Sequence, residues 1–243
     1  MADLAVLKLG GSVLTDLRAY HTAARFLRDE VVRTQAQIVA VVSAEEGHTD
    51  RLRDEAFSIA DEPDADALDL LWSTGELRSV ALLTLALRAE GVAATGLNVH
   101  ETGLRVHPTE GRRPGVADLV LNPLSLRSAL GRHDIVVVPG FLATCRQQVV
   151  TLGRGGSDWS AVALAASLGA DRCELIKDVP GYFTADPRAS ANAALLTSLD
   201  YATALQMADE GCPLVQRSAL DHARLAQLPL VIRNFDSLGT RVA

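Results

Sequence analysis

Residues 4–12 read LAVLKLGGS, and this stretch sets the pattern for the rest of the chain. Five of its first six side chains are apolar, and Lys8 is the exception. The pair Gly10-Gly11 then ends the run, because glycine allows backbone turns that other residues disfavour. Continuous apolar runs of this length are typical of strands that are buried on both faces of a sheet. We therefore predict a buried first strand that ends in a glycine turn.

Apolar runs and amphipathic stretches alternate along the remaining sequence. Further strands are predicted at 37–42, 134–138, 173–176 and 229–232, the last of which closes the fold. Helices are predicted around 21–34, 65–91, 159–168, 201–209 and 219–226, with an interruption near Ser73-Thr74-Gly75. This alternation indicates an α/β fold with a largely parallel sheet that is covered on both faces.

Glycine, small hydroxyl groups and an acid follow the predicted strands. The residues are Gly10-Gly11-Ser12, Ser43, Pro139-Gly140 and Asp178. In open parallel sheets, ligands bind beyond the carboxyl ends of the strands. We expect the chemistry of the protein at that edge.

Composition excludes several classes of protein. Hydrophobic residues make up 48% and charged residues 22% of the 243, which is an ordinary globular balance. The formal net charge of −7 argues against a nucleic-acid-binding protein, which needs a basic face. An anionic substrate would therefore be attracted by local groups rather than by the overall field.

Cysteine usage and the N-terminus bear on the compartment. Cys145, Cys173 and Cys212 form no CxxC pair, which argues against a disulfide framework or a thiolate zinc site. The histidines show no metal-ligand spacing such as HExxH. No apolar run resembles a signal peptide or a membrane span. We expect a cytoplasmic protein with no membrane and no nucleic-acid partner.

Lys8 and the glycines that follow it form the first candidate site. Glycine lets the backbone approach a ligand closely and turn its N–H groups toward an anion, and lysine adds a compact positive charge. A plain strand-to-helix turn with a solvated lysine is an equal alternative for this segment alone. Neither GxxxxGK[ST] nor GxGxxG occurs in the chain, so no Walker A loop or dinucleotide fingerprint is present.

The second candidate site is residues 151–158, TLGRGGSD, which lead into a predicted helix. Glycines before a helix favour anion binding, and Arg154 can grip a carboxylate with two parallel hydrogen bonds. Asp158 can pair with an amine. Simple capping, with Ser157 or Asp158 as N-cap, accounts for part of this pattern but not for an arginine among three glycines. A serine-hydrolase elbow is excluded because GxSxG is missing.

Five ordered segments resemble motifs of the amino acid kinase family, and in particular the catalytic domain of aspartate kinases. They are KLGGS at 8–12, residues 42–50 (from Val42-Ser43-Ala44 to Gly47, Thr49 and Asp50), residues 73–79 (STGE through Ser79), TLGRGGSDWSAVALAASLGA at 151–170 with IKDVPGYFTADPR at 176–188, and residues 229–234 with Gly239-Thr240. Together the matches cover nearly the whole chain. The usual pair of C-terminal regulatory ACT domains is not expected within it.

The resemblance implies a single three-layer αβα sandwich spanning 1–243, with an acid-substrate lobe at about 1–135 and a nucleotide lobe at about 136–243. It implies an ATP-dependent kinase, with Mg²⁺ carried mainly by ATP, that converts the side-chain carboxylate of aspartate to an acyl phosphate. A kinase for another amino acid or small acid in specialised biosynthesis, and a non-catalytic nucleotide-binding subunit, are the alternatives. The resemblance is also consistent with a homodimer.

Family roles carry over by position. Lys8 would stabilise the transferring phosphoryl group with the N–H groups of Gly10, Gly11 and Ser12, and Lys8 and Asp158 would be the catalytic pair. The acid site would comprise Ser43, Thr49, Glu76, Arg154, Gly155, Gly156, Ser157 and Asp158. Within it, Arg154 would take the α-carboxylate, and Glu76 and Asp158 would meet the amino group. The nucleotide stretch would comprise Lys177, Asp178, Phe183, Asp186 and Arg188.

Three departures from the family pattern stand out. Lys177-Asp178 replaces Thr-Asp, so Lys177 either reaches a nucleotide phosphate or is a solvated strand end. Pro213 stands where the family carries a lysine, and Lys177 or Arg217 is the candidate to compensate. Glu45-Glu46 replaces small or apolar residues, which predicts either a solvated turn or a changed acid preference. The basic segment 105–114 is expected to be a solvated hairpin or loop.

Overall fold

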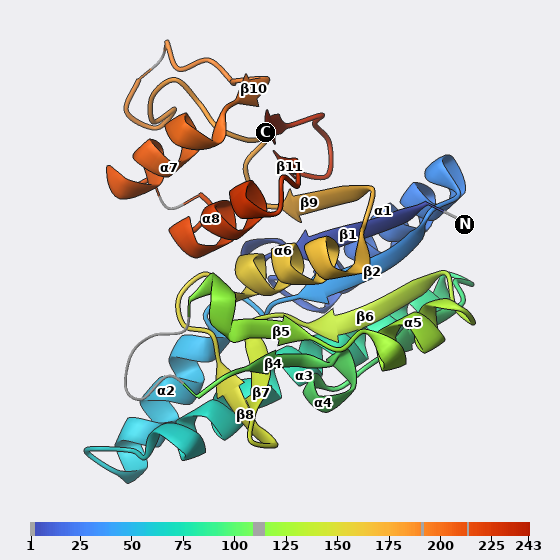
Figure 1. The fold of residues 1–243 in the computed structure, drawn as a ribbon, viewed down its shortest axis with the longest axis vertical. Helices are drawn as coiled ribbons and strands as arrows, with labels where there is room; N and C mark the ends of the chain where they lie inside the picture. Colours follow the sequence, from blue (N-terminus) through green and yellow to red (C-terminus); the bar gives the residue numbers. More distant parts are fainter. Residues whose placement is uncertain (1–2, 109–114, 191, 213) are drawn as a thin grey trace.

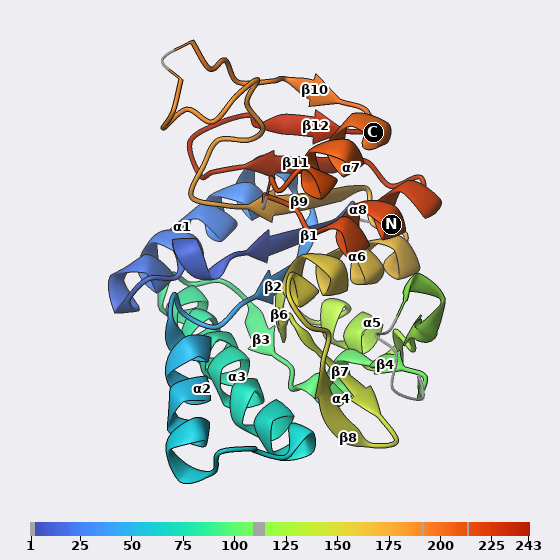
Figure 2. The ribbon, with the colours of Figure 1, turned by 90° about the vertical axis from the view of Figure 1, so that its left-hand side faces the viewer.

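The computed structural model describes residues 3–108, 115–190, 192–212 and 214–243. A central sheet separates two layers of helices (Figures 1 and 2). Helices α1 (Leu17–Thr34) and α3 (Ala65–Ala89) cover one face, and α5 (Leu124–Leu130), α6 (Gly156–Leu168) and α8 (Arg217–Leu225) cover the other. The three-layer α/β sandwich is therefore confirmed.

The main sheet contains eight strands among the described residues, in the order β10-β12-β11-β9-β1-β2-β6-β3. Their bounds are β1 Leu4–Leu9, β2 Gln37–Val42, β3 Ala94–Gly96, β6 Ile135–Pro139, β9 Arg172–Ile176, β10 Ser198–Leu199, β11 Leu230–Arg233 and β12 Thr240–Val242. The pairs from β3 to β11 are all parallel, and β12 runs antiparallel to β11. The carboxyl ends of β1, β2, β6 and β9 consequently meet at one edge.

A second, smaller sheet was not predicted. Its order is β5-β4-β7-β8, with β4 at Leu104–Val106, β5 at Leu119–Leu121, β7 at Leu142–Cys145 and β8 at Gln148–Thr151. The β7–β8 hairpin leads from β6 to α6, and β8 packs beside α3. Short strands without a long apolar run carry little sequence signal, which explains the omission. Of the segment 105–114, Arg105 lies in β4, and 109–114 fall outside the described residues.

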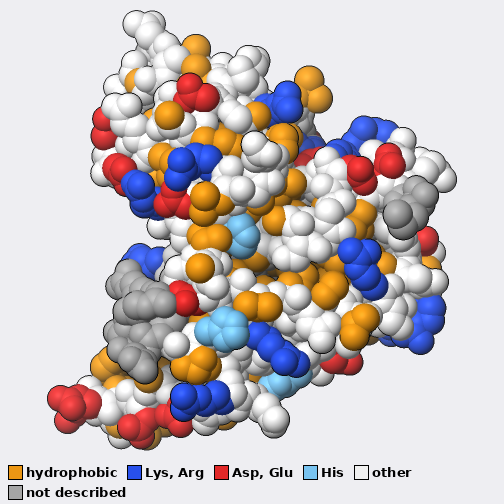
Figure 3. Space-filling model, viewed as in Figure 1, with side chains coloured by type: hydrophobic (Ala, Val, Ile, Leu, Met, Phe, Trp, Pro, Cys, Tyr) orange, Lys and Arg blue, Asp and Glu red, His pale blue; other side chains and the backbone are white. Residues whose placement is uncertain are grey.

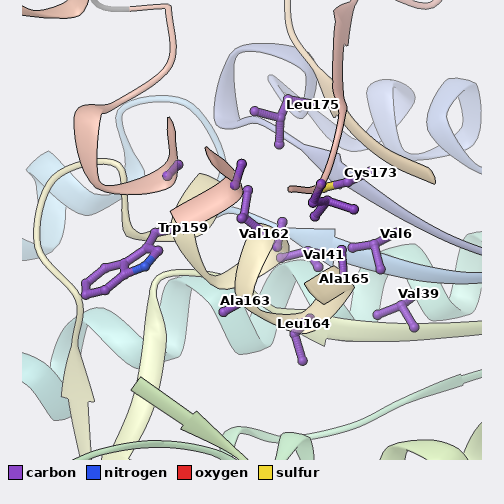
Figure 4. Close-up of a cluster of buried hydrophobic side chains, with 14 of the residues drawn as sticks. Val6, Val39, Val41, Trp159, Val162, Ala163, Leu164, Ala165, Cys173 and Leu175 are labelled. Carbon is purple, nitrogen blue, oxygen red and sulfur yellow. The ribbon is translucent and has the colours of Figure 1, made fainter. Parts of the chain in front are cut away.

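Two apolar cores fill the space between the layers. One packs α6 and α8 against the sheet and includes Trp159, Val162 and Cys173 (Figure 4). The other packs α1 and α3 against the opposite face. Valine, leucine and alanine supply most of both cores, as the low aromatic content requires. The charged side chains of both signs are interspersed over the face that Figure 3 shows.

Most predicted elements form within a few residues of their expected bounds, and α7 spans Tyr201–Asp209 as predicted. The expected break at Ser73-Thr74-Gly75 is wrong, because α3 runs unbroken from Ala65 to Ala89. A Cβ at Gly75 would lie 2.9 Å from His48 Cδ2 and 3.0 Å from Ala44 Cβ. Gly75 therefore allows close packing against α2 (His48–Ile59) rather than ending the helix, and tertiary contact outweighs its low propensity.

The structure also contains a strand and a helix that were not predicted. Strand β11 does not close the fold, because β12 follows it and pairs with it antiparallel. Helix α2 had not been predicted. The remaining short elements are α4 at Val99–Thr102, η1 at Gly11–Val13 and η2 at Val116–Asp118.

Helix α3 is the one described helix that is long and apolar enough to cross a membrane by length and composition. Half of its most apolar window is buried within the fold, and it packs against α1, α2 and the sheet. These contacts are those of a core helix.

A buried ionic network joins α1 to the centre of the sheet. Arg233 donates from Nε to Glu174 Oε2 at 2.6 Å and from Nη2 to Glu30 Oε1 at 3.1 Å. Its guanidinium carbon lies 4.9 Å from the centroid of the Phe26 ring. Arg172 Nη1 also lies 3.0 Å from Glu174 Oε1 and 3.7 Å from Glu30 Oε2, so two arginines share these two buried carboxylates.

Removing Arg233 should destabilise the fold. Arg233→Met removes the most buried of these cations and leaves Glu30 and Glu174 only the more exposed Arg33 and Arg172, so we expect the free energy of unfolding to fall by about 3 kcal/mol. Urea denaturation at pH 7 measures it. Arg217→Met is the matched control, because Arg217 pairs with Asp209 on the surface and should leave the urea midpoint nearly unchanged. Equal midpoints for Arg233→Met and wild type would contradict a stabilising role for the network.

Candidate functional site

A cavity of about 670 Å³ opens at the carboxyl edge of the sheet. Predicted site residues from four different segments line it, namely Gly11, Ser12, Ser43, Thr49, Glu76, Arg154, Gly155, Gly156 and Ser157. The turn after β1, the loop after β2 with the first turn of α2, helix α3 and the start of α6 thus converge on one hollow. The parallel topology brings them together, since the strand ends share an edge.

Glycines let these segments touch. A Cβ at Gly11 would lie 2.8 Å from the carbonyl oxygen of Ala44, and one at Gly140 would lie 2.8 Å from Ser157 Cβ. Real Cβ atoms do not approach other atoms so closely, so any larger residue would push the segments apart. The glycines of the motifs are therefore required for packing around the cavity.

Lys8, Asp158 and Lys177 form a buried cluster beside this cavity. Lys8 Nζ lies 2.7 Å from Asp158 Oδ1, and Lys177 Nζ lies 2.7 Å from Asp158 Oδ2. Lys8 pairs in register with Leu175, so Lys177 follows two residues after its cross-strand neighbour. Strands β1 and β9 deliver the two lysines, and the first turn of α6 delivers the carboxylate.

The cluster carries one more positive than negative charge. Burial lowers the pKa of Lys8 to about 8. The attraction of Asp158 opposes this shift, and the repulsion of Lys177 adds to it. Burial alone would raise the pKa of Asp158, but the two ammonium groups outweigh it and lower that pKa to about 2. Asp158 is therefore ionised at neutral pH, and Lys8 is mostly charged.

The turn after β1 reaches the same cluster. Ser12 Oγ donates to Asp178 Oδ1 at 2.9 Å, which ties the turn to the segment after β9. A Cβ at Gly10 would lie 3.4 Å from Lys8 Nζ. Gly10 thus lies beside Lys8, and the hydrogen bond from Ser12 joins the turn after β1 to the residue that follows Lys177.

Arg154 lies at the other wall of the cavity. It precedes α6, whose N-cap is Gly155 in the left-handed conformation (φ 73°). The prediction of Ser157 or Asp158 as N-cap is wrong, because Gly155 takes that position and Asp158 turns toward the lysines instead. Arg154 is exposed, and no described side chain pairs with its guanidinium. A free bidentate donor therefore faces the cavity.

Glu76 supplies a buried negative group on α3. Its Oε1 accepts a hydrogen bond from the Ala44 N–H at 3.3 Å, and its Oε2 is buried without a partner among the described residues. Burial raises the pKa of Glu76 to about 7, although the hydrogen bond from Ala44 opposes this. A cationic ligand group in the cavity would satisfy the free oxygen and favour the charged form.

Glu45 and Glu46 also line the cavity, and they differ in environment. Glu45 pairs with Arg78 Nη1 at 2.5 Å, close to the Tyr20 hydroxyl that hydrogen-bonds Ser79. Glu46 is exposed. The pairing with Arg78 compensates one of the two charges, and the solvent screens the other.

Sequence reasoning missed an aromatic wall. Trp72 and Phe141 both line the cavity, with ring centroids 6.4 Å apart in an edge-on arrangement. Trp72 precedes Glu76 by four residues and so lies on the same face of α3. Phe141 adopts a left-handed backbone conformation (φ 64°), which is strained for a bulky residue. A single aromatic residue outside a motif gives no sequence signal of this role.

Comparison with known proteins agrees with this arrangement. The model of the amino acid kinase family matches residues 3–234. The chain belongs to the amino acid kinase family. An aspartokinase from Thermus thermophilus is 37% identical over 233 residues, which are 95% of this chain and 56% of that relative. The chain thus spans little more than half the length of the curated relatives it matches.

Solved structures of amino acid kinases superpose closely. Aspartate kinase from Synechocystis has a TM-score of 0.87 at 36% identity, over 99% of this chain and 40% of that one. Escherichia coli aspartokinase III, solved with aspartate and ADP, has a TM-score of 0.82 at 26% identity, over 99% of this chain and 64% of that one. The resemblance that the motifs suggested is confirmed at the level of family and fold.

Other predicted residues of this amino acid kinase lie away from the cavity. Phe183, Asp186 and Arg188 are on the loop between β9 and β10, and Asp186 Oδ1 accepts from the Arg188 N–H at 2.9 Å. Their nucleotide role stays a prediction. Pro213 falls outside the described residues. Arg217 pairs with Asp209 and with Asp221.

The buried carboxylate of Glu76 should leave a signature in stability. Its pKa in the folded protein, about 7, exceeds its ordinary value of 4.5. The stability that this group contributes is therefore fully present below pH 4.5 and is lost as pH rises through 7. Glu76→Gln removes the buried charge, so at pH 8 its free energy of unfolding should exceed that of wild type by about 3 kcal/mol at most.

Urea denaturation from pH 4.5 to pH 8 measures the effect. The two proteins should be similar at the acid end, and their difference should grow as pH rises. Glu46→Gln, which removes an exposed carboxylate from the same cavity, should show no such growth. Parallel stability profiles for wild type and Glu76→Gln would refute the shifted titration.

Proposed function

We propose that this chain is an ATP-dependent aspartate kinase that phosphorylates the side-chain carboxylate of its substrate. One observation carries the proposal: a single cavity presents the guanidinium of Arg154, which pairs with no described side chain, and the carboxylate of Glu76, whose Oε2 has no described partner, and the cluster around Asp158 lies beside it. Aspartate kinases are similar to this chain over most of its length, and this similarity supports aspartate as the acid. The substrate is then a small amino acid with a second carboxylate.

Each charged end of aspartate has a partner. Arg154 would hold the α-carboxylate with two parallel hydrogen bonds, and Ser43, Thr49 and the 155–157 segment would line the acid pocket. Glu76 would accept from the ammonium group through its free oxygen. Asp158 was predicted to meet the ammonium too, but lysines occupy both of its oxygens, so its proposed role is to hold them in position.

The reaction needs positioning and charge more than covalent help from the protein. A side-chain carboxylate oxygen attacks the γ-phosphorus of ATP, the bond from that phosphorus to the β–γ bridging oxygen breaks, and ADP leaves with the bonding pair. Lys8 would lie against the transferring group, with Gly10, Gly11 and Ser12 beside it, and would stabilise charge on the phosphoryl oxygens. No proton transfer is required.

ATP would extend from this cluster along the predicted nucleotide stretch, from Asp178 to Phe183, Asp186 and Arg188. The complex of the Escherichia coli relative with ADP supports a nucleotide in this fold. In the described part of the chain, no group of three or more His, Cys, Asp or Glu residues converges on a point. Mg²⁺ would therefore be held chiefly by the ATP phosphates and water, where it neutralises phosphate charge.

We also propose a cytoplasmic location.

The acidic loop after β2 bears on the choice of acid. Because Arg78 neutralises Glu45, only Glu46 adds uncompensated charge at this wall, and it is exposed. A dianionic acid is therefore compatible with the cavity. Residues 141–157 contribute to this pocket, so the acid site draws on both sides of the proposed lobe boundary near 135.

A panel of acids tests the function. With Mg²⁺, ATP and hydroxylamine, aspartate should yield a hydroxamate, and Lys8→Ala should slow its formation by roughly 100-fold or more. Hydroxamate from another acid but not from aspartate would identify a paralogous kinase. ATP binding without product from any acid would identify a non-catalytic subunit. Equal rates for wild type and Lys8→Ala would reject the role of Lys8.

Arg154 should govern the affinity for the acid. Arg154→Ala removes a charge-assisted pair of hydrogen bonds, and we expect the KM for aspartate to rise roughly 10- to 100-fold. The KM for ATP should change little. Arg154→Lys keeps the charge without the planar fork and should be intermediate. A larger effect on the KM for ATP than on that for aspartate would reverse the assignment.

A further inference from the structure

The chain contains only two lysines, Lys8 and Lys177, among 23 cationic Lys and Arg residues. They lie 169 residues apart in sequence, yet both ammonium groups contact the same carboxylate, one on each oxygen of Asp158 at 2.7 Å. All other cationic positions are arginine. Both lysines thus lie at the buried carboxylate of Asp158. The lysine ammonium is a compact charge whose pKa shifts readily on burial.

A structural salt bridge does not require two lysines. Lys8 alone would neutralise Asp158, and the second ammonium leaves the cluster with a surplus positive charge. Both lysine side chains are largely buried, with 7% and 13% of their surface exposed, and desolvating an uncompensated cation is costly. A surplus of this kind is expected where a ligand brings the missing negative charge.

Among the described residues, Asp158 is the one carboxylate that forms an ion pair with either lysine. The nearby titratable groups are the Cys173 thiol and the Tyr182 hydroxyl, and burial raises the pKa of both, so they stay neutral. Asp178, the residue after Lys177, accepts a hydrogen bond from Ser12 and forms no ion pair among the described residues. The surplus charge therefore lies beside the glycine turn at the cavity edge.

We propose that Lys177 is a second catalytic cation, which contacts the transferring phosphoryl group together with Lys8 while Asp158 holds the two ammonium groups in position. The inference rests on the proposed kinase function. It assigns to Lys177 an action on the reacting group, in addition to a simple contact with bound nucleotide. Phosphoryl transfer moves negative charge among oxygens, so two flanking cations stabilise it better than one.

Arg217, the other candidate to replace the cation lost at Pro213, is engaged elsewhere. Its guanidinium pairs with Asp209 and Asp221, on helices α7 and α8, and its side chain is half exposed. The side chain of Lys177 is 13% exposed and lies at the cluster. The geometry favours Lys177 for this role.

Kinetics with matched variants test the proposal. Lys177→Met keeps the length of the side chain and leaves a neutral Lys8–Asp158 pair, so the protein should fold with undiminished resistance to urea. We expect kcat to fall roughly 100-fold, with a smaller change in the KM for aspartate. Arg217→Met should retain wild-type kcat. A Lys177→Met protein with kcat within threefold of wild type, or with lost activity explained by lost stability, would overturn the proposal.

The pH profile gives a readout that a structural role would not produce. The repulsion of Lys177 helps to lower the pKa of Lys8, so its removal should raise that pKa. The alkaline limb of kcat/KM should therefore shift to higher pH in Lys177→Met. An unshifted limb would contradict direct coupling of the two ammonium groups.

Because only two lysines are present, nuclear magnetic resonance can observe them without an activity assay. Protein labelled with ¹³C at lysine Cε should give two side-chain signals, and Lys177→Met identifies one of them. Adding Mg²⁺ with a non-hydrolysable ATP analogue should shift both signals. A shift of Lys8 alone, or of neither, would overturn the assignment of Lys177.

The two proposals can fail separately. If both signals shift but no acid is phosphorylated, Lys177 lies at a phosphate site and the kinase function is wrong. If aspartate is phosphorylated and Lys177→Met is unimpaired, the function holds and the second catalytic cation does not.

Discussion

The shared carboxylate of Asp158 is the interaction on which this site depends. It draws β1, β9 and α6 together, because each contributes one charged group to a cluster that water scarcely reaches. A buried carboxylate needs a partner, and here it has two, which leaves a positive charge beside the glycine turn. The apolar cores on both faces of the sheet hold the three elements close enough for that contact.

Close approach of loops is the second requirement. Gly11 lies against Ala44, Gly140 lies against Ser157, and Gly155 leaves no room for a side chain beside Gln216. The cavity is therefore bounded by backbone as much as by side chains. Walls formed by backbone fix the distance between an acid site and a phosphate site better than long side chains do.

Much of the fold was predictable because the hydrophobic pattern of each strand is contained in a few consecutive residues. The run at 4–9 and the β-branched run at 37–42 form buried strands on hydrophobic pattern alone, and the helix at 201–209 had matching bounds. The motifs identified Arg154 and Glu76 as cavity residues. What failed depended on contacts between distant segments. Gly75 signals a break in isolation, but its missing Cβ makes room for Ala44, and so α3 continues.

The same limit applies to the site. Nothing in the sequence shows that Lys8 and Lys177 share one acid, because the register of β1 and β9 decides it. The motif suggested that Asp158 binds the amino group or caps the helix, and both roles assume that its oxygens are free. Trp72 and Phe141 were invisible for a related reason, since their ring contact joins α3 to the turn after β6.

The arrangement of charged groups along the site links the stability of the folded protein to the proposed activity. Among the described residues, the free protein holds an unpaired guanidinium at Arg154, a buried carboxylate at Glu76 and a surplus positive charge at Asp158, and the last two weaken the folded state. Aspartate carries the inverse pattern of a carboxylate, an ammonium and a second carboxylate, and ATP adds further negative charge. Ligands that complete each pair would relieve the cost of burying unpaired groups. The features that destabilise the empty site are therefore those that would make it selective for a zwitterionic acid beside a phosphate.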